Sequence, residues 1–157
     1  TDYSTLTIEN HRMYARLRDH QFSLYEDYAR KRGLQGKSLL ILLWIYRHPK
    51  GISQQTITRH TYSTKQVVNA VIKNFSKKGY IKSTVHPKDR RKKLIMLTEK
   101  GRQFAASIID LMDEAEKKAF SQLSAKQQQT LIETTHLFTD ILTQEFMRLI
   151  KEICPDI

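Results

Sequence analysis

The spacing of hydrophobic residues changes at Gly79, and this change limits the possible folds more than any other feature of the sequence. Before Gly79, residues 63–78 carry apolar side chains at the three-to-four spacing of an amphipathic helix. After it, β-favouring residues flank the basic, turn-rich segment HPKDRRKK: Tyr80, Ile81, Val85, Leu94, Ile95 and Leu97. The sequence therefore predicts a helix followed directly by a β-hairpin with a charged loop at residues 86–93.

A second short helix is expected immediately before this one. Ser53 is placed to cap a helix that runs to about His60. Ser63 is placed to cap the next helix, to Lys78, and Gln66 completes the spacing of a capping box. Helix, helix and hairpin in this order predict an α+β, mostly α protein with a winged helix-turn-helix module.

Long amphipathic segments lie on both sides of this module. Helices are expected at residues 5–31, 38–48, 98–122 and 124–153. The first and last carry apolar stripes that the small central module cannot cover. We therefore expect residues 1–35 and 103–157 to form a helical dimerisation domain, with residues 36–102 as the winged-helix domain and a homodimer as the assembly.

The positive charge of the chain is concentrated in the same central module. The chain has 27 Lys and Arg against 16 Asp and Glu. Residues 53–102 hold thirteen of these cations and only two acids, Asp89 and Glu99, so the remainder has fourteen of each sign. A basic surface that serves only solubility would be spread over the chain, whereas a polyanion-binding face concentrates its cations. This distribution predicts double-stranded DNA as the partner.

Other classes of protein are disfavoured. The longest apolar run, Leu39 to Ile45, is far shorter than the roughly 18 residues that span a bilayer, and residues 1–12 do not resemble a secretory signal. The single cysteine, Cys154, fits a reducing compartment, so we expect a cytoplasmic protein without a membrane partner. Glycine-rich phosphate loops, nucleophile motifs and clustered metal ligands are absent from the sequence, which predicts no enzyme activity, no metal and no cofactor.

The helix before Gly79 divides into two faces. A helical projection places Val68, Val71, Ile72 and Phe75 on one side and Gln66, Asn69, Ala70, Lys73 and Lys77 on the other. Any amphipathic helix has a polar outer face, but the charge concentration favours DNA contact here. In a helix-turn-helix, Asn and Gln pair with adenine and Lys reaches guanine in the major groove. Base contacts are expected from Gln66, Asn69, Lys65 and Lys73, although Gln66 has a competing use in the capping box.

The loop at residues 86–93 carries five cations around Asp89. Such density is unfavourable without a polyanion nearby, and arginine suits a narrow minor groove. A solvated turn that protects an edge strand is the alternative interpretation.

Three motifs resemble the MarR family of bacterial transcriptional regulators: Lys77-Lys78-Gly79-Tyr80-Ile81, Asp89-Arg90-Arg91, and Leu97-Thr98-x-x-Gly101. The resemblance implies a homodimer with interlocked terminal helices that binds pseudo-palindromic operator DNA. It also implies that Arg91 enters the minor groove and that Asp89 orients the wing through an intramolecular pair. Ala70 and Ser76 depart from the arginine and glutamate that the family often has. The full set of expected DNA-contacting residues is Ser63, Thr64, Lys65, Gln66, Asn69, Lys73, Lys88, Asp89, Arg90, Arg91 and Lys92.

The family resemblance further implies release of DNA by a small aromatic or lipophilic effector. The residues that could line an effector cleft are Tyr14, Trp44, Tyr46 and His48, and an ordinary role in the core is the alternative for each of them. A different function also stays open, that of a helical dimeric interaction protein whose basic face binds an acidic protein or an anionic membrane surface.

Overall fold

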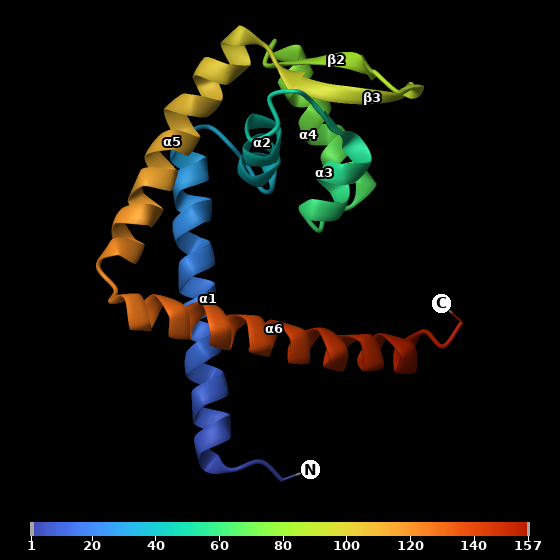
Figure 1. Ribbon diagram of the computed structural model, residues 1–157. Helices are drawn as coiled ribbons and strands as arrows, with labels where there is room; N and C mark the ends of the chain where they lie inside the picture. The colour runs from blue at the N-terminus through green and yellow to red at the C-terminus, as the bar shows by residue number, and fades with distance from the viewer. Residues whose placement is uncertain (1, 157) are drawn as a thin grey trace. The chain divides into compact units, whose positions relative to one another are not determined.

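The computed structural model describes residues 2–156, so Thr1 and Ile157, the outermost residues of the expected helical domain, lie outside the described part. Its elements, in chain order, are α1 (Thr5–Lys31), α2 (Ser38–Tyr46), β1 (Ile52–Ser53), α3 (Gln54–His60), α4 (Lys65–Lys77), β2 (Ile81–His86), β3 (Asp89–Leu97), α5 (Glu99–Ser121) and α6 (Ala125–Ile153) (Figure 1). The expected fold class, a mostly helical winged helix-turn-helix, is confirmed.

Polar side chains cap several helices at their N-termini. Ser4, Ser53 and Ser124 each accept a hydrogen bond from a backbone N–H in the first turn, and Ser124 forms a complete capping box with Gln127. At α4 the sequence prediction is wrong by one residue, because Thr64 rather than Ser63 is the N-cap. The turn after α3 uses Ser63 instead, since its backbone N–H donates to Thr58 O at 3.1 Å.

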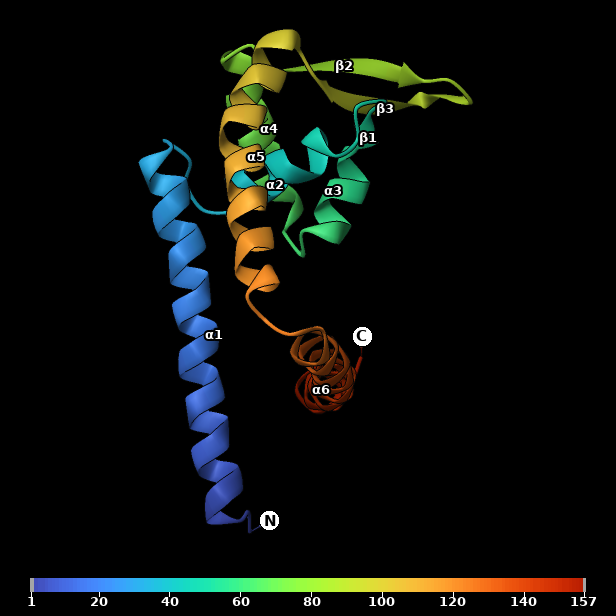
Figure 2. The same cartoon turned by 60° about the vertical axis from the view of Figure 1, so that its left-hand side comes forward.

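The sheet has three antiparallel strands in the order β1-β3-β2. β1 was not predicted, because two residues are too few to show alternation; it pairs Ile52 with Ile95 and Ser53 with Leu94. Figure 2 shows it beside β3. This third strand pairs with β3 at Leu94 and Ile95 only, so the tip of the hairpin is two-stranded.

The basic loop expected at residues 86–93 is shorter than predicted, and most of its cations lie within β3. His86 is paired with Asp89, whereas the preceding residue Val85 is paired with Lys93. Three residues of β3, Arg90 to Lys92, therefore have no counterpart in β2 and form a bulge. Arg90 and Arg91 therefore lie in a bulged strand next to a tight turn, and not in a flexible loop.

A hydrophobic core fixes α4 with its polar face outward. The largest fully buried hydrophobic side chains come from α2, α3, α4 and α5: Ile41, Leu42, Ile45, Ile57, Val68, Phe75 and Ile108. Each such side chain contributes about 1.5–3 kcal/mol through removal of apolar surface from water. Val68 and Phe75 are the two residues that anchor α4 in this core.

The start of α5 is joined closely to the end of α4. Thr98 Oγ1 accepts from the backbone N–H of Gly101 at 3.0 Å and donates to Gly79 O at 2.6 Å. The backbone N–H of Thr98 donates to Tyr80 O at 2.9 Å. A Cβ atom on Gly101 would lie 1.9 Å from that same carbonyl oxygen. Only glycine allows this approach, which gives a structural reason for a glycine inside a helix.

The chain forms two compact units that divide between Leu111 and Met112. The first contains α1, the winged helix and the beginning of α5, and the second contains the remainder of α5 and α6. The expected domain boundaries at residues 35/36 and 102/103 stay a prediction. Among residues 2–156, the structure contains no helix long and apolar enough to cross a membrane.

Large apolar side chains remain exposed along two helices of the single chain. On α1 these are Leu6, Ile8, Met13, Tyr14, Leu17, Phe22, Leu24 and Tyr25. On α6 they are Leu131, Ile132, Leu137, Phe138, Ile141, Leu142, Phe146, Met147, Leu149, Ile150 and Ile153. Apolar surface of this extent is typical of a protein interface rather than of a monomer.

Candidate nucleic-acid interface

The outer face of α4 is polar and accessible, as the helical projection predicted. Gln66, Asn69 and Lys73 are exposed, while Val68 and Phe75 are buried. Because Thr64 takes the N-cap position, Gln66 does not serve as a capping-box partner. Its carboxamide is therefore available for an intermolecular contact.

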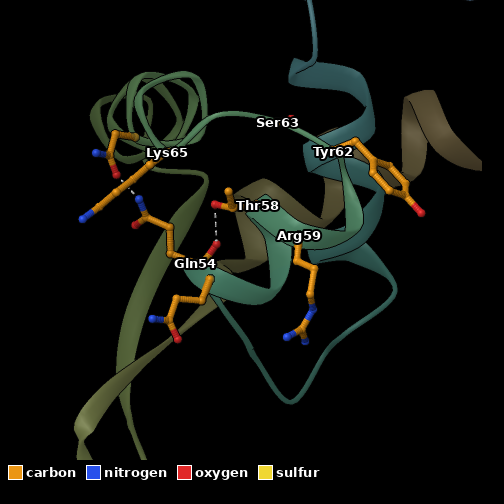
Figure 3. A pocket seen from close by; sticks show the side chains of 8 residues that line it. Gln54, Thr58, Arg59, Tyr62, Ser63 and Lys65 are labelled. Atoms are coloured by element: carbon orange, nitrogen blue, oxygen red, sulfur yellow. Dashed lines mark hydrogen bonds between the residues drawn. The ribbon is translucent and has the colours of Figure 1, made fainter. Parts of the chain in front are cut away.

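A groove of about 640 Å³, here called the cationic groove, lies between α3 and the N-terminal part of α4. Figure 3 shows the side chains that line it, which are Gln54, Gln55, Thr58, Arg59, Tyr62, Ser63, Lys65 and Asn69. The lining includes two cationic side chains and no carboxylate. A concave surface of this composition can accept an anionic chain such as a nucleic-acid backbone.

The carboxamide of Asn69 is held by a residue of the neighbouring helix. Gln54 Nε2 donates a hydrogen bond to Asn69 Oδ1, as drawn in Figure 3. Thr58 Oγ1 in turn donates to the backbone O of Gln54 at 2.9 Å. The bond from Gln54 orients the Asn69 amide and leaves its N–H groups free to meet a partner. A residue of α3 therefore orients Asn69, whereas the sequence analysis considered only α4 at this face.

The wing tip is organised by two short side-chain bonds. Asp89 Oδ1 accepts from the backbone N–H of Arg91 at 3.0 Å, and His86 Nδ1 accepts from the backbone N–H of Lys88 at 3.0 Å. The family resemblance implied that Asp89 orients the wing through an intramolecular pair. In the structure its partner is the Arg91 backbone, so the guanidinium of Arg91 stays free of its neighbour.

The cations of this region are electrostatically uncompensated. Within residues 2–156, no carboxylate forms an ion pair with any of the interface cations Arg59, Lys65, Lys73, Lys88, Arg90, Arg91 and Lys92. The ion pairs of the structure lie elsewhere, for example between Arg30 and Asp27 on α1 at 2.7 Å. Cations without internal partners on an exposed face favour binding of an external anion.

The four residues expected to line an effector cleft near the first two helices are not among those that line the groove between α3 and α4, and that cleft stays a prediction. The ring of Trp44 stacks on His48, with 5.7 Å between centroids, and on His60, with 4.6 Å. Tyr46 Oη donates to Asp110 Oδ1 at 2.9 Å, and this hydrogen bond raises the pKa of Tyr46. Tyr14 lies on α1 with its side chain exposed.

Sequence reasoning missed the contribution of α3. Gln54 and Thr58, and likewise Gln55 and Arg59, are separated by four residues, which places each pair on one side of a helix. This spacing could have identified a second polar face beside α4. Tyr62 was also missed, because a turn residue has no periodic pattern.

No group of three or more His, Cys, Asp and Glu side chains that could hold a metal ion is found among the described residues. The lone cysteine, Cys154, is a half-buried free thiol at the C-terminal end of α6.

Comparisons with known proteins agree with this geometry. Residues 32–92 match the family model described as the MarR family. A curated relative, the uncharacterized HTH-type transcriptional regulator YdcH of Bacillus subtilis, is 21% identical over 84 residues, which is 54% of this chain and 57% of that protein. The chain thus matches little more than half the length of that relative.

Two solved structures have the same fold. One is the S. aureus MepR–DNA complex, with a TM-score of 0.71 and 20% identity, covering 83% of this chain and 94% of that one. The other is PcaV from Streptomyces coelicolor in complex with its natural ligand, with a TM-score of 0.64 and 16% identity, covering 89% and 98%.

Proposed function

We propose that this chain, whose residues 32–92 match the MarR family model, is a transcriptional regulator of that family that binds double-stranded DNA as a homodimer. The observation that carries the proposal is the juxtaposition of the polar face of α4, the cationic groove beside it and a bulged basic wing. None of these cations has an acidic partner within residues 2–156. MepR, which shares this fold, has been solved in complex with DNA.

The two parts of the interface have different tasks in this proposal. The N-terminal part of α4 enters the major groove, where Gln66 and Asn69 read base edges and Lys65 and Lys73 meet bases or phosphates. Ser63 and Thr64 approach the backbone beside them. The wing follows the DNA backbone with its bulge, and Arg91 enters the minor groove while Lys88, Arg90 and Lys92 neutralise phosphates.

The dimer is proposed from the exposed apolar residues of α1 and α6. A two-fold assembly would cover them and present two equivalent α4 helices, so its DNA site should be pseudo-palindromic with half-sites about 10 base pairs apart. A protein that regulates transcription in this way acts in the cytoplasm. A compact monomer in sedimentation at micromolar concentration would contradict the dimer.

Selection of bound duplexes from a random pool tests the DNA-binding function directly, because the recovered sequences reveal both affinity and symmetry. The alternative is binding to an acidic protein or anionic membrane, and vesicles with anionic headgroups are the competing probe. Recovery of a palindromic site with no vesicle binding supports the regulator. Tight vesicle binding with no duplex enrichment would refute it.

Two variants then test the assigned roles on the selected duplex. Arg91→Ala should weaken binding to all duplexes and lower the slope of log affinity against log salt by roughly one unit. Asn69→Ala removes no charge, so it should leave the slope unchanged and cost on the order of 1–3 kcal/mol on the selected site only. Lys126→Ala, an exposed cation on α6, is the matched control and should change neither quantity. Equal weakening of both duplexes by Asn69→Ala would show that α4 does not read bases.

Release of DNA by a small aromatic or lipophilic effector is a further part of the proposal. It is supported by the aromatic surroundings of Trp44 and by the bound ligand of PcaV. A panel of phenolic and lipophilic compounds should contain members that raise the melting temperature and lower DNA affinity. A panel without effect on either quantity would remove the effector from the proposal.

A further inference from the structure

Tyr62, in the turn between α3 and α4, combines an unusual backbone conformation with an exposed side chain. Its φ is 51°, and among residues 2–156 it is the one residue other than glycine with a positive φ. Its side chain is 91% exposed. L-residues with side chains rarely adopt this left-handed conformation, because Cβ approaches the following carbonyl oxygen.

The conformation is imposed by the way α3 ends. The backbone N–H of Tyr62 donates to Arg59 O at 3.3 Å, and that of Ser63 donates to Thr58 O at 3.1 Å. These two bonds define a helix C-terminal motif in which glycine usually takes the left-handed position. A tyrosine there makes the turn less favourable than glycine would.

The turn is also held from outside by Lys37, which precedes α2. Its Nζ donates to Thr61 O at 2.9 Å and to Tyr62 O at 2.7 Å. The hydroxyl of buried Thr61 donates to Ile57 O at 2.7 Å. Because the backbone is fixed on both sides of the turn, the direction in which Tyr62 projects is fixed as well.

Nothing within the described chain accounts for the aromatic side chain itself. The ring and hydroxyl of Tyr62 have no hydrogen bond, ion pair or ring contact with any residue from 2 to 156. The residue lies at one edge of the cationic groove, which Arg59 and Lys65 also line, and its ring projects away from the groove (Figure 3). A strained position that keeps a large side chain without an internal contact points to an external one.

We propose that Tyr62 binds the DNA backbone by donating its phenolic hydroxyl to a phosphate oxygen at the edge of this groove. The inference rests on the proposed function and adds a residue to its interface. A phosphate is favoured over a base because Tyr62 precedes the N-terminus of α4 and lies outside its base-facing side. Tyrosine hydroxyls are common donors to backbone phosphates in protein–DNA complexes.

The test measures binding of the full chain to a duplex of mixed sequence and to the selected duplex across a salt series. Tyr62→Phe keeps the ring and the backbone conformation but removes the donor, so it should weaken binding to both duplexes by about tenfold. The salt slope should not change, because a neutral group displaces no counterion. Tyr3→Phe, at an exposed tyrosine before α1, is the matched control and should bind like the wild type.

Tyr62→Gly separates binding from folding. Glycine fits the left-handed position, so this variant should melt no lower than the wild type while binding DNA at least as weakly as Tyr62→Phe. A lower melting temperature for Tyr62→Gly would show that the ring has a structural role and would overturn the inference. Wild-type affinity for Tyr62→Phe would overturn it as well, and would leave the proposed function intact. Wild-type protein that binds no duplex at all would overturn the proposed function itself.

Discussion

Replacement of Gly101 by alanine should destabilise the protein, although alanine is the better helix former. Alanine in place of glycine inside a helix favours folding by about 1 kcal/mol. At this position the new methyl group would lie 1.9 Å from Tyr80 O, so the joint between α4 and α5 must open. Overpacking against a structure that cannot move easily costs about 1–3 kcal/mol.

The same displacement weakens a hydrogen bond. Tyr80 O is the acceptor for the backbone N–H of Thr98 at 2.9 Å, and its loss costs about 1 kcal/mol. With the helix-propensity gain subtracted, the free energy of unfolding should fall by about 1–3 kcal/mol. For a chain of this size, that corresponds to a melting temperature lower by about 2–12 °C.

Thermal or urea unfolding at one fixed protein concentration measures this change, because a dimer's stability depends on concentration. Gly33→Ala is a suitable comparison, since Gly33 has a φ of 76° and a Cβ atom added there would have no neighbour within 4 Å. Gly33→Ala should lower the free energy of unfolding by about 1 kcal/mol, because alanine is less stable than glycine in this left-handed backbone conformation. Unchanged or increased stability of Gly101→Ala would refute the argument that the carbonyl cannot give way.

Two further substitutions test contacts that link α2 to the rest of the first unit. Lys37→Met removes the two hydrogen bonds to Thr61 O and Tyr62 O, which hold the turn that carries Tyr62. DNA affinity should therefore fall on the order of fivefold. In a salt series, the slope of log affinity against log salt should change by well under one unit. Tyr46→Phe removes the hydrogen bond to Asp110 and should cost about 0.5–1 kcal/mol near pH 7. Because the folded pKa of Tyr46 is raised above its ordinary value of 10.0, this contribution is present below pH 10 and is lost as the pH rises through the folded pKa. The two proteins should therefore converge in stability during alkaline titration, and a constant difference would contradict the assignment.

The helices could be predicted from the sequence because their signals are local. Capping residues and apolar periodicity placed α1, α3 and α6 within a residue or two of their observed ends. The error at Ser63 arose because serine and threonine are adjacent and both can cap a helix. Only the turn that ends α3, a feature of the folded backbone, shows that the N-cap is Thr64.

Features that depend on contacts distant in sequence could not be predicted. β1 exists because Ile52 meets Ile95 across the sheet, and neither residue alone indicates that pairing. The bulge in β3 depends in the same way on the register with β2. The groove required knowledge of how α3 lies against α4, so Gln54 and Arg59 were left out of the expected interface.

The wing differs in how its two ends are attached to the protein. At its base, β1 pairs with Leu94 and Ile95. Beyond that point the hairpin is two-stranded, and Arg90 to Lys93 are exposed. Substitutions there remove no buried contact, so the tip can vary in charge and length almost without a folding penalty. Folding therefore places little constraint on the wing tip, where the proposed contact with DNA is the main constraint, whereas close packing at Gly101 constrains the joint at the other end of β3.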